Sequence, residues 1–209
     1  MEKAQDLKFG TDGWRGIMAR DFTFDNVRRV AQAIADYVKE ETEKNPKKKP
    51  PFSGPVLVGY DRRFLSDAFA REIAQVLEGN QLNPVLLAET LPTPAISFLT
   101  RKLNGLGVMV TASHNPATYN GIKIKLDGRA VLENVTTGVE SCLDRNLPSR
   151  SNDYKQKSFR DAYLQYLKSR INTKAISAKL KRPVIIDYLY GAATGLFEEL
   201  VTSKHVTTI

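Results

Sequence analysis

The sequence is poor in cysteine and histidine, with one Cys and two His among 209 residues. The single Cys142 excludes an internal disulfide and any metal site that needs several cysteines, which favours a reducing compartment. No apolar run is long enough to cross a bilayer, and the start of the chain lacks the basic-then-apolar pattern of a secretory signal. We therefore expect a soluble, cytoplasmic protein with no membrane partner.

Acidic residues are also fewer than basic ones: the sequence has 23 Asp and Glu and 31 Lys and Arg, which gives a formal net charge of +8. Such a charge suits an anionic partner without distinguishing nucleic acid, membrane and a phosphorylated metabolite. The densest basic run, Lys47 to Lys49, lies between prolines and is typical of a solvated loop. Helix-turn-helix, zinc-finger and aromatic-basic RNA signatures are missing. We expect no nucleic-acid partner, and keep a noncatalytic phosphate- or nucleic-acid-binding module as the alternative.

Apolar periodicity alternates between helix and strand along the first part of the chain. Three-and-four spacing after Asp25, a plausible N-cap, predicts a helix to Val38. A second helix is predicted from Ser66, as its cap, to Gly79. The remaining predictions are strands at 56–60, 84–88 and 106–111 and a helix from Pro94 to Leu103. This alternation predicts a three-layer α/β/α sandwich with a mixed, mostly parallel sheet.

Residues 121–126 alternate strictly between apolar and basic side chains. Lys123 and Lys125 therefore share one face of a strand, which we predict to be exposed to water. A turn at Asp127–Gly128 and a further helix through Leu143 complete this first domain, residues 1–145.

The rest of the chain predicts a second unit. Residues 146–157 are polar and without periodicity, which is typical of an interdomain linker. Residues 158–209 then restart with an amphipathic helix, a buried-type strand at 183–187, a glycine-rich turn and a helix before a last strand. We predict an incomplete second α/β domain in which the chain stops inside a β-α-β unit, with self-association through its uncovered strands as an expected consequence.

The segment from Thr111 to Lys123 holds the best candidates for chemistry. It directly follows an apolar strand, and ligands of open α/β sheets bind beyond the carboxyl ends of strands. Ser113 there could be a nucleophile, a phosphate carrier or a turn former, since Ser, His, Asn and Pro are ordinary turn residues. Lys123 on a wet strand face would usually be solvated, although surrounding cations can lower a lysine pKa toward the working range.

Four segments occur in order along the chain: FGTDGWRG at 9–16, GYDRR at 59–63, LPTP at 91–94 and TASHNPATYNGIK at 111–123. Together they resemble the α-D-phosphohexomutases, the family of phosphoglucomutases and phosphomannomutases. The last segment resembles the family's phosphoserine loop. The resemblance is dense over residues 7–145 and looser over 158–209, where the family's second domain begins.

This resemblance implies an isomerase that acts by intramolecular phosphotransfer. Ser113 would carry a phosphate, pass it to a hydroxyl of a hexose phosphate and regain one from the hexose 1,6-bisphosphate, which is also the implied activator. Arg15 is implied as a contact near the phosphoserine and Lys123 as a general acid or base. His114 is implied as a phosphate or substrate contact, with turn stabilisation as its alternative, and Asn120 as a loop former that approaches the substrate.

The resemblance also implies a magnesium ion, held by an oxygen of the Ser113 phosphate and by three aspartates of a D-G-D-x-D-R loop. This sequence does not contain that loop, nor the family's sugar-reading G-E-x-S-G-H loop. We therefore expect little or no mutase activity from this chain alone. Asp12 and Asp61 are predicted to pair with neighbouring arginines rather than to bind metal. Trp14 stands where phosphoglucosamine mutases usually carry isoleucine, which favours a phosphoglucomutase or phosphomannomutase over that alternative.

Overall fold

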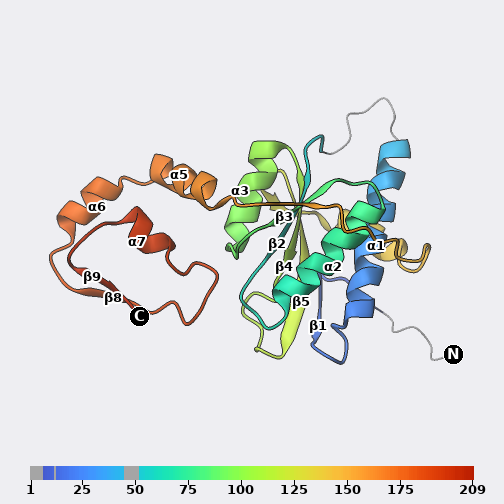
Figure 1. The fold of residues 1–209 in the computed structure, drawn as a ribbon, viewed down its shortest axis with the longest axis horizontal. Helices are drawn as coiled ribbons and strands as arrows, with labels where there is room; N and C mark the ends of the chain where they lie inside the picture. Colours follow the sequence, from blue (N-terminus) through green and yellow to red (C-terminus); the bar gives the residue numbers. More distant parts are fainter. Residues whose placement is uncertain (1–6, 12, 45–51) are drawn as a thin grey trace.

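The computed structural model describes residues 7–11, 13–44 and 52–209 (Figure 1). Two predictions lie outside these ranges: the basic loop at Lys47–Lys49 and the pairing of Asp12. Within them, none of the helices combines the length and the apolar character needed to cross a bilayer.

The main body is built on a seven-stranded sheet of order β1-β5-β4-β2-β3-β7, with β6 paired to β5. Its strands are β1 Gly13–Ile17, β2 Val56–Tyr60, β3 Pro84–Leu87, β4 Leu106–Val110, β5 Tyr119–Leu126, β6 Arg129–Ala130 and β7 Lys155–Lys157. The pairs β2–β3, β2–β4 and β3–β7 are parallel, whereas β5 is antiparallel to β1, β4 and β6. β5 thus runs against its neighbours, and the predicted mixed, mostly parallel sheet is confirmed.

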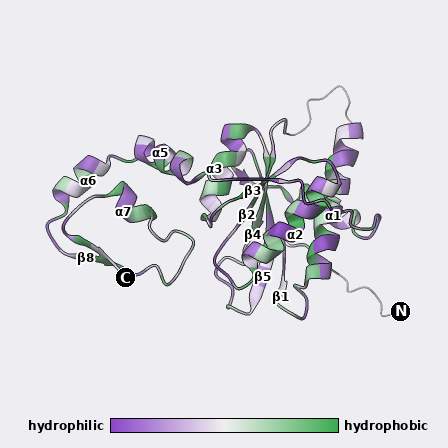
Figure 2. Cartoon of the chain, in the orientation of Figure 1, coloured by the Kyte–Doolittle hydropathy of each residue, from purple (hydrophilic) through white to green (hydrophobic). Residues whose placement is uncertain are grey.

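Helices cover both faces of this sheet (Figure 1). The helices of the main body are α1 Phe24–Lys44, α2 Ser66–Gly79, α3 Thr93–Leu103 and α4 Glu133–Ser141. α1, α2 and α4 share one apolar core with Val56 and Val58, while α3 shares a second core with the intervening Leu57. Alternate residues of a strand point to opposite faces, so β2 is buried on both. The helices themselves carry both hydrophobic and hydrophilic residues, as expected of a covering layer (Figure 2).

The predicted helices are all present, but α1 continues to Lys44 beyond the predicted Val38, and both predicted N-caps are wrong. α1 begins at Phe24, two residues earlier than a cap at Asp25 predicts, so the cap is Thr23, whose Oγ1 accepts a hydrogen bond from the Asn26 amide at 3.2 Å. α2 includes Ser66 as its first residue, and the Ser66 hydroxyl donates to Asp61 instead of capping the helix. Gly79 does end α2, as predicted.

The predicted wet face of β5 is also wrong. Lys123 and Lys125 are 9% and 8% exposed, so both are buried. The reason is that the second face of β5 is covered by α3: Lys125 lines a groove together with Ser97 and Arg101 of that helix. Strand alternation distinguishes the two faces of β5 but does not reveal a helix packing on the polar one.

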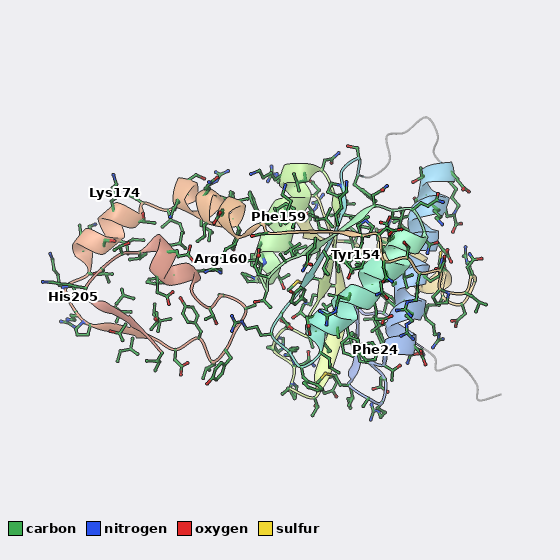
Figure 3. All side chains as sticks on the ribbon, viewed as in Figure 1. Phe24, Tyr154, Phe159, Arg160, Lys174 and His205 are labelled. Atoms are coloured by element: carbon green, nitrogen blue, oxygen red, sulfur yellow. The ribbon has the colours of Figure 1, made fainter. Side chains whose placement is uncertain are left out.

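The second part of the chain packs against α3. Its elements are α5 Arg160–Arg170, α6 Thr173–Lys179, β8 Val184–Ile186, α7 Leu196–Leu200 and β9 Val206–Thr208. Tyr166 of α5 stacks on Phe98 of α3 with ring centroids 4.2 Å apart. Phe159, labelled in Figure 3 at the start of α5, is buried in the same core as Leu99. β8 and β9 form a separate parallel pair, as the sequence predicts.

Four elements were not predicted. β1 lies in the FGTDGWRG segment, for which no strand was predicted, and it pairs with β5, a strand more than 100 residues later. β7 lies within the polar segment 146–157 and extends the main sheet beside β3. β6 has two residues and follows the predicted turn at Asp127–Gly128, and α6 is too short for its period to be recognised. β1 and β7 are edge strands whose existence depends on a distant strand, which explains why local patterning missed them.

Candidate active site

A cleft of about 770 Å³ lies at the carboxyl ends of β2 and β4. The loop after β2 contributes residues 61–64, the loop after β4 contributes Thr111 and residues 113–115 and 117, and the turn after β8 contributes residues 189–192. Three parts of the chain thus meet at one sheet edge, the position at which open α/β sheets bind ligands.

Ser113 is exposed at this edge, just beyond the end of β4. Its backbone has φ of 58°, in the left-handed region that few non-glycine residues adopt. The Ser113 amide donates to Thr111 Oγ1 at 2.9 Å, and the Asn115 amide donates to the Ala112 carbonyl at 3.1 Å. This tight turn holds the Ser113 side chain out of the sheet and into the cleft. Backbone strain of this kind persists where surrounding contacts determine the geometry, and it is common at functional sites.

Arg63 holds the Ser113 loop in place through the backbone carbonyls of the loop. Its guanidinium donates four hydrogen bonds of 2.7 to 3.0 Å to backbone carbonyls, those of Ser113, Asn115, Pro116 and Tyr119. Four charge-assisted hydrogen bonds from one planar group define the loop conformation far better than the loop's own turn bonds could. Arg63 belongs to the GYDRR segment, but its role in the site was not predicted from the sequence.

A second chain of hydrogen bonds continues from Arg63 into the interior. The Arg63 amide donates to Asp61 Oδ1 at 3.0 Å, and the guanidinium pairs with Asp61 Oδ2 at 3.5 Å. Ser66 Oγ donates to Asp61 at 2.8 Å and accepts from Asn120 Nδ2 at 2.9 Å. The prediction that Asp61 is a structural partner of an arginine is confirmed. Because this network ties β2, α2 and β5 together, the loop rests on a rigid base.

Asn120 belongs to this base and is fully buried. Its side-chain oxygen accepts from the Gly121 amide at 2.9 Å while its nitrogen bonds Ser66. It is not among the residues that line the cleft. Asn120 thus links β5 to α2 through Ser66, and its expected approach to the substrate stays a prediction.

Arg15 reaches the Ser113 loop from β1. Its Nη1 donates to Asn115 Oδ1 at 2.8 Å, although 100 residues separate the two in sequence. Arg15 lies opposite Gly121 in the β1–β5 register, and a Cβ at Gly121 would lie 2.9 Å from Arg15 Cγ. A glycine at this position thus leaves space for the arginine. Its partner Asn115 lies two residues after Ser113 in the loop. Arg15 itself is exposed and does not line the cleft.

His114 and Lys123 occupy different environments. His114 is exposed, lines the cleft, and has Nδ1 at 3.5 Å from Ser113 Oγ, the long limit of a hydrogen bond. Lys123 is buried on β5 and does not line the cleft, but it lies directly opposite Met109 in the β4–β5 register, and Met109 does line it. Opposite residues of an antiparallel pair share a face, so Lys123 lies beside the cleft floor.

Arg62 is a cleft residue that was not predicted from the sequence. It is exposed, and its Nε is 3.4 Å from Thr90 Oγ1. The sequence signal was the doubled arginine of GYDRR, of which one side chain points inward to the loop and the other toward solvent. Arg62 and Arg63 give the lining of this cleft two guanidinium groups.

Fold and site together define a class: an α/β protein that presents a strained, exposed serine among arginines at the carboxyl edge of its sheet, an arrangement suited to a phosphate group. The chain belongs to the phosphoglucomutase/phosphomannomutase family, whose α/β/α domain I matches residues 6–149. The resemblance seen in the sequence is therefore confirmed.

Relatives within this family carry different names. The chain is 31% identical to a phosphoglucosamine mutase of Thermotoga petrophila over 92% of its own length and 42% of the relative's. It is 38% identical to a phosphoglucomutase of Staphylococcus saprophyticus over 56% of the chain and 20% of that protein. A crystal structure described as a phosphomannomutase of Thermus thermophilus matches with a TM-score of 0.87 at 33% identity, over 98% of this chain and 46% of the other. The chain thus spans less than half of each of these proteins.

Proposed function

We propose that this chain is the phosphoserine-carrying part of a phosphohexomutase, and that Ser113 is the residue that carries the phosphate. The observation on which the proposal rests is the exposed Ser113 hydroxyl, at the end of a parallel strand, on a loop that Arg63 holds through four backbone carbonyls. Phosphoryl transfer requires a protein mainly to position the reacting groups and to neutralise charge. The Arg63-held loop meets the first requirement, because it positions Ser113.

The proposed transfer is a displacement at phosphorus. A hydroxyl oxygen of the hexose phosphate attacks the phosphorus of phospho-Ser113, forms a new P–O bond and breaks the bond to Ser113 Oγ. The hydroxyl proton passes to a general base, and Ser113 leaves as an alkoxide that is protonated afterwards. The bisphosphate then reorients in the site, so that its other phosphate faces Ser113. The reverse displacement returns that phosphate to Ser113, and the net result is that a phosphate has moved between positions 1 and 6 of the sugar.

Cations around Ser113 would stabilise the charge on the transferring oxygens. Arg15 is the first proposed contact of this phosphate, because its guanidinium already hydrogen-bonds Asn115 of the same loop. His114 in the cleft is the second candidate contact. Lys123 is proposed as the general acid or base, and its place beside Met109 requires its ammonium to reach past the cleft floor.

Magnesium and the hexose 1,6-bisphosphate activator remain part of the proposal through the family resemblance alone. In the described ranges no group of three or more His, Cys, Asp or Glu side chains is placed to hold a metal ion. Asp61, the carboxylate that lines the cleft, is engaged by Arg63 and Ser66. These residues therefore do not form a magnesium site by themselves, and we propose little turnover from this chain alone.

We propose a hexose phosphate as substrate, with glucosamine phosphate as the alternative, because relatives with both names match this chain. Trp14, which favoured the first in the sequence, is 3% exposed and stacks on Phe22 with ring centroids 4.8 Å apart. A buried core residue does not contact a sugar, so Trp14 gives no physical reason to prefer either substrate. Comparing glucose 1,6-bisphosphate with glucosamine 1,6-bisphosphate as phosphate donors to Ser113 would decide between the two substrates.

The central test is to incubate the chain with α-D-glucose 1,6-bisphosphate and to map the phosphorylated peptide by mass spectrometry. We expect slow transfer of one phosphate to Ser113 and none in Ser113→Ala. Ser169→Ala, which removes an exposed hydroxyl from α5, is the matched control and should be phosphorylated like the wild type. A phosphate on another serine, or equal phosphorylation of Ser113→Ala, would contradict the assignment.

A further inference from the structure

Large apolar side chains are unusually exposed around the Ser113 cleft. Phe64 is 72% exposed, Leu189 80% and Tyr190 87%, and all three line it. In the rest of the described chain, Leu147 and Ile209 are the other large apolar side chains above 70%. Apolar residues scattered singly over a surface need no explanation, but a group of them that shares a concave site with polar residues is typical of a ligand pocket.

The three side chains come from two sides of the cleft. Phe64 lies in the turn that leads into α2, directly after the two arginines of GYDRR. Leu189 and Tyr190 lie in the turn after β8, more than 120 residues later. The exposed Arg62 and the proposed phosphate contact His114 line the same cleft. The site therefore combines an apolar part with a cationic part, as a ligand with an anionic end and a less polar body requires.

The turn after β8 is built to display its side chains. Leu189 and Tyr190 have φ of 45° and 58°, the left-handed region that bulky residues rarely adopt. The turn is held by hydrogen bonds from the Leu189 amide to Asp187 Oδ1 at 2.8 Å and from the Gly191 amide to the Tyr188 carbonyl at 2.7 Å. A strained turn that keeps two apolar side chains in water is explained if a ligand contacts them.

We propose that Phe64 and Tyr190 contact the hexose ring and that they help to select a sugar phosphate over free phosphate. A hexopyranose carries C–H bonds on its ring faces, and these pack well on aromatic rings, while its hydroxyl groups stay at the rim. The phosphate would lie toward Arg62 and His114. This inference rests on the proposed function, since it supplies the sugar-recognising part of the same cleft.

The test compares two ligands on the same chain by NMR titration: α-D-glucose 1-phosphate and inorganic phosphate. The wild type should bind the sugar phosphate more tightly than phosphate alone. Tyr190→Ala and Phe64→Ala should each weaken glucose 1-phosphate binding by roughly three- to tenfold and leave phosphate binding unchanged. Tyr190→Phe should keep the wild-type affinity, and Leu147→Ala, at an exposed apolar position outside the cleft, is the control.

The outcomes separate this inference from the function on which it rests. Unchanged glucose 1-phosphate affinity in both alanine variants would overturn it, and so would an equal loss of affinity for phosphate, because the side chains would then act on the loop rather than on the sugar. A wild type that binds both ligands equally would also overturn it while leaving phosphate binding at Ser113 intact. A wild type that binds neither ligand would overturn the proposed function as well.

Discussion

Arg63 shows how one side chain can determine the shape of a site. Replacing it by alanine would leave the loop carbonyls without their donor and Asp61 without its cation. We expect Arg63→Ala to lower the free energy of unfolding by roughly 2–4 kcal/mol, since buried groups that lose charge-assisted partners cost more than an average hydrogen bond. Urea denaturation monitored by circular dichroism measures this.

Arg62 provides the matched control for that measurement. It is the neighbouring arginine, but it is exposed and its hydrogen bond to Thr90 is long, at 3.4 Å. Arg62→Ala should therefore change the free energy of unfolding by less than about 0.5 kcal/mol. Equal effects of the two substitutions would show that the Arg63 network does not stabilise the loop as we infer.

Cys142 is a residue whose chemistry is suppressed by its surroundings. Burial raises the pKa of its thiol; Arg145 opposes this shift, while Glu40, whose Oε2 is 3.7 Å from Sγ, adds to it. At pH 8 the thiolate is thus scarcer in the folded than in the unfolded chain. We expect iodoacetamide to react with the native protein at least about tenfold more slowly than with the urea-unfolded protein.

The sign of this shift also sets a pH dependence. A raised thiol pKa in the folded state contributes stability that is present below the ordinary thiol pKa and is lost as pH rises through the folded value.

The control for the iodoacetamide reaction is Ser141→Cys. It places a second thiol at the exposed neighbouring position, and this thiol should react rapidly in the native state. Rapid native labelling of Cys142 itself would show that it is accessible.

At the scale of elements, Glu89 joins the main body to α5. Its Oε1 accepts hydrogen bonds from Ser158 Oγ and from the amides of Phe159 and Arg160, at 3.1 to 3.2 Å. A carboxylate at a helix N-terminus satisfies unpaired amides and opposes the helix dipole. Glu89→Ala should destabilise α5 by about 1 kcal/mol, seen as faster hydrogen exchange of its amides.

The control for this substitution is Glu133→Ala, which removes an exposed carboxylate from the first turn of α4. It should leave hydrogen exchange in α5 unchanged. If Glu89→Ala did the same, the contacts between Tyr166 and Phe98 would be sufficient to hold α5 on α3 without the cap.

At the scale of the whole molecule, the part of the chain after α5 is less well packed than the described residues of the main body. Two cores bury the main sheet, and α5 and Leu196 of α7 share the second of them. β8 and β9 form a two-stranded sheet in which Ile185 is 69% exposed. Sheets of two strands are marginal in water, and exposed strand edges attract further strands.

Limited proteolysis should therefore cut residues 182–209 first and leave residues 52–145 intact. Mass mapping of the early fragments measures this, and sedimentation at several concentrations shows whether the segment is protected by pairing with another copy of the chain. A monomer in which both regions resist equally would contradict the expected difference.

The sequence by itself determined the order of most strands and helices, because burial repeats with the period of each element. It also determined the place of the Ser113 segment, since an apolar run directly precedes it. These features depend on neighbours along the chain, and local patterning is sufficient to predict them.

The tertiary structure decided the rest through partners that are distant in sequence. Lys123 and Lys125 are buried because α3 crosses their face, and β1 exists because β5 pairs with it. Arg63 became a loop-holding residue only when the chain placed four carbonyls from 50 or more residues away around it. The same is true of Tyr190, which joins the Ser113 cleft from the far end of the chain. Periodicity carries no information on such contacts, because each depends on where two separate segments meet in space.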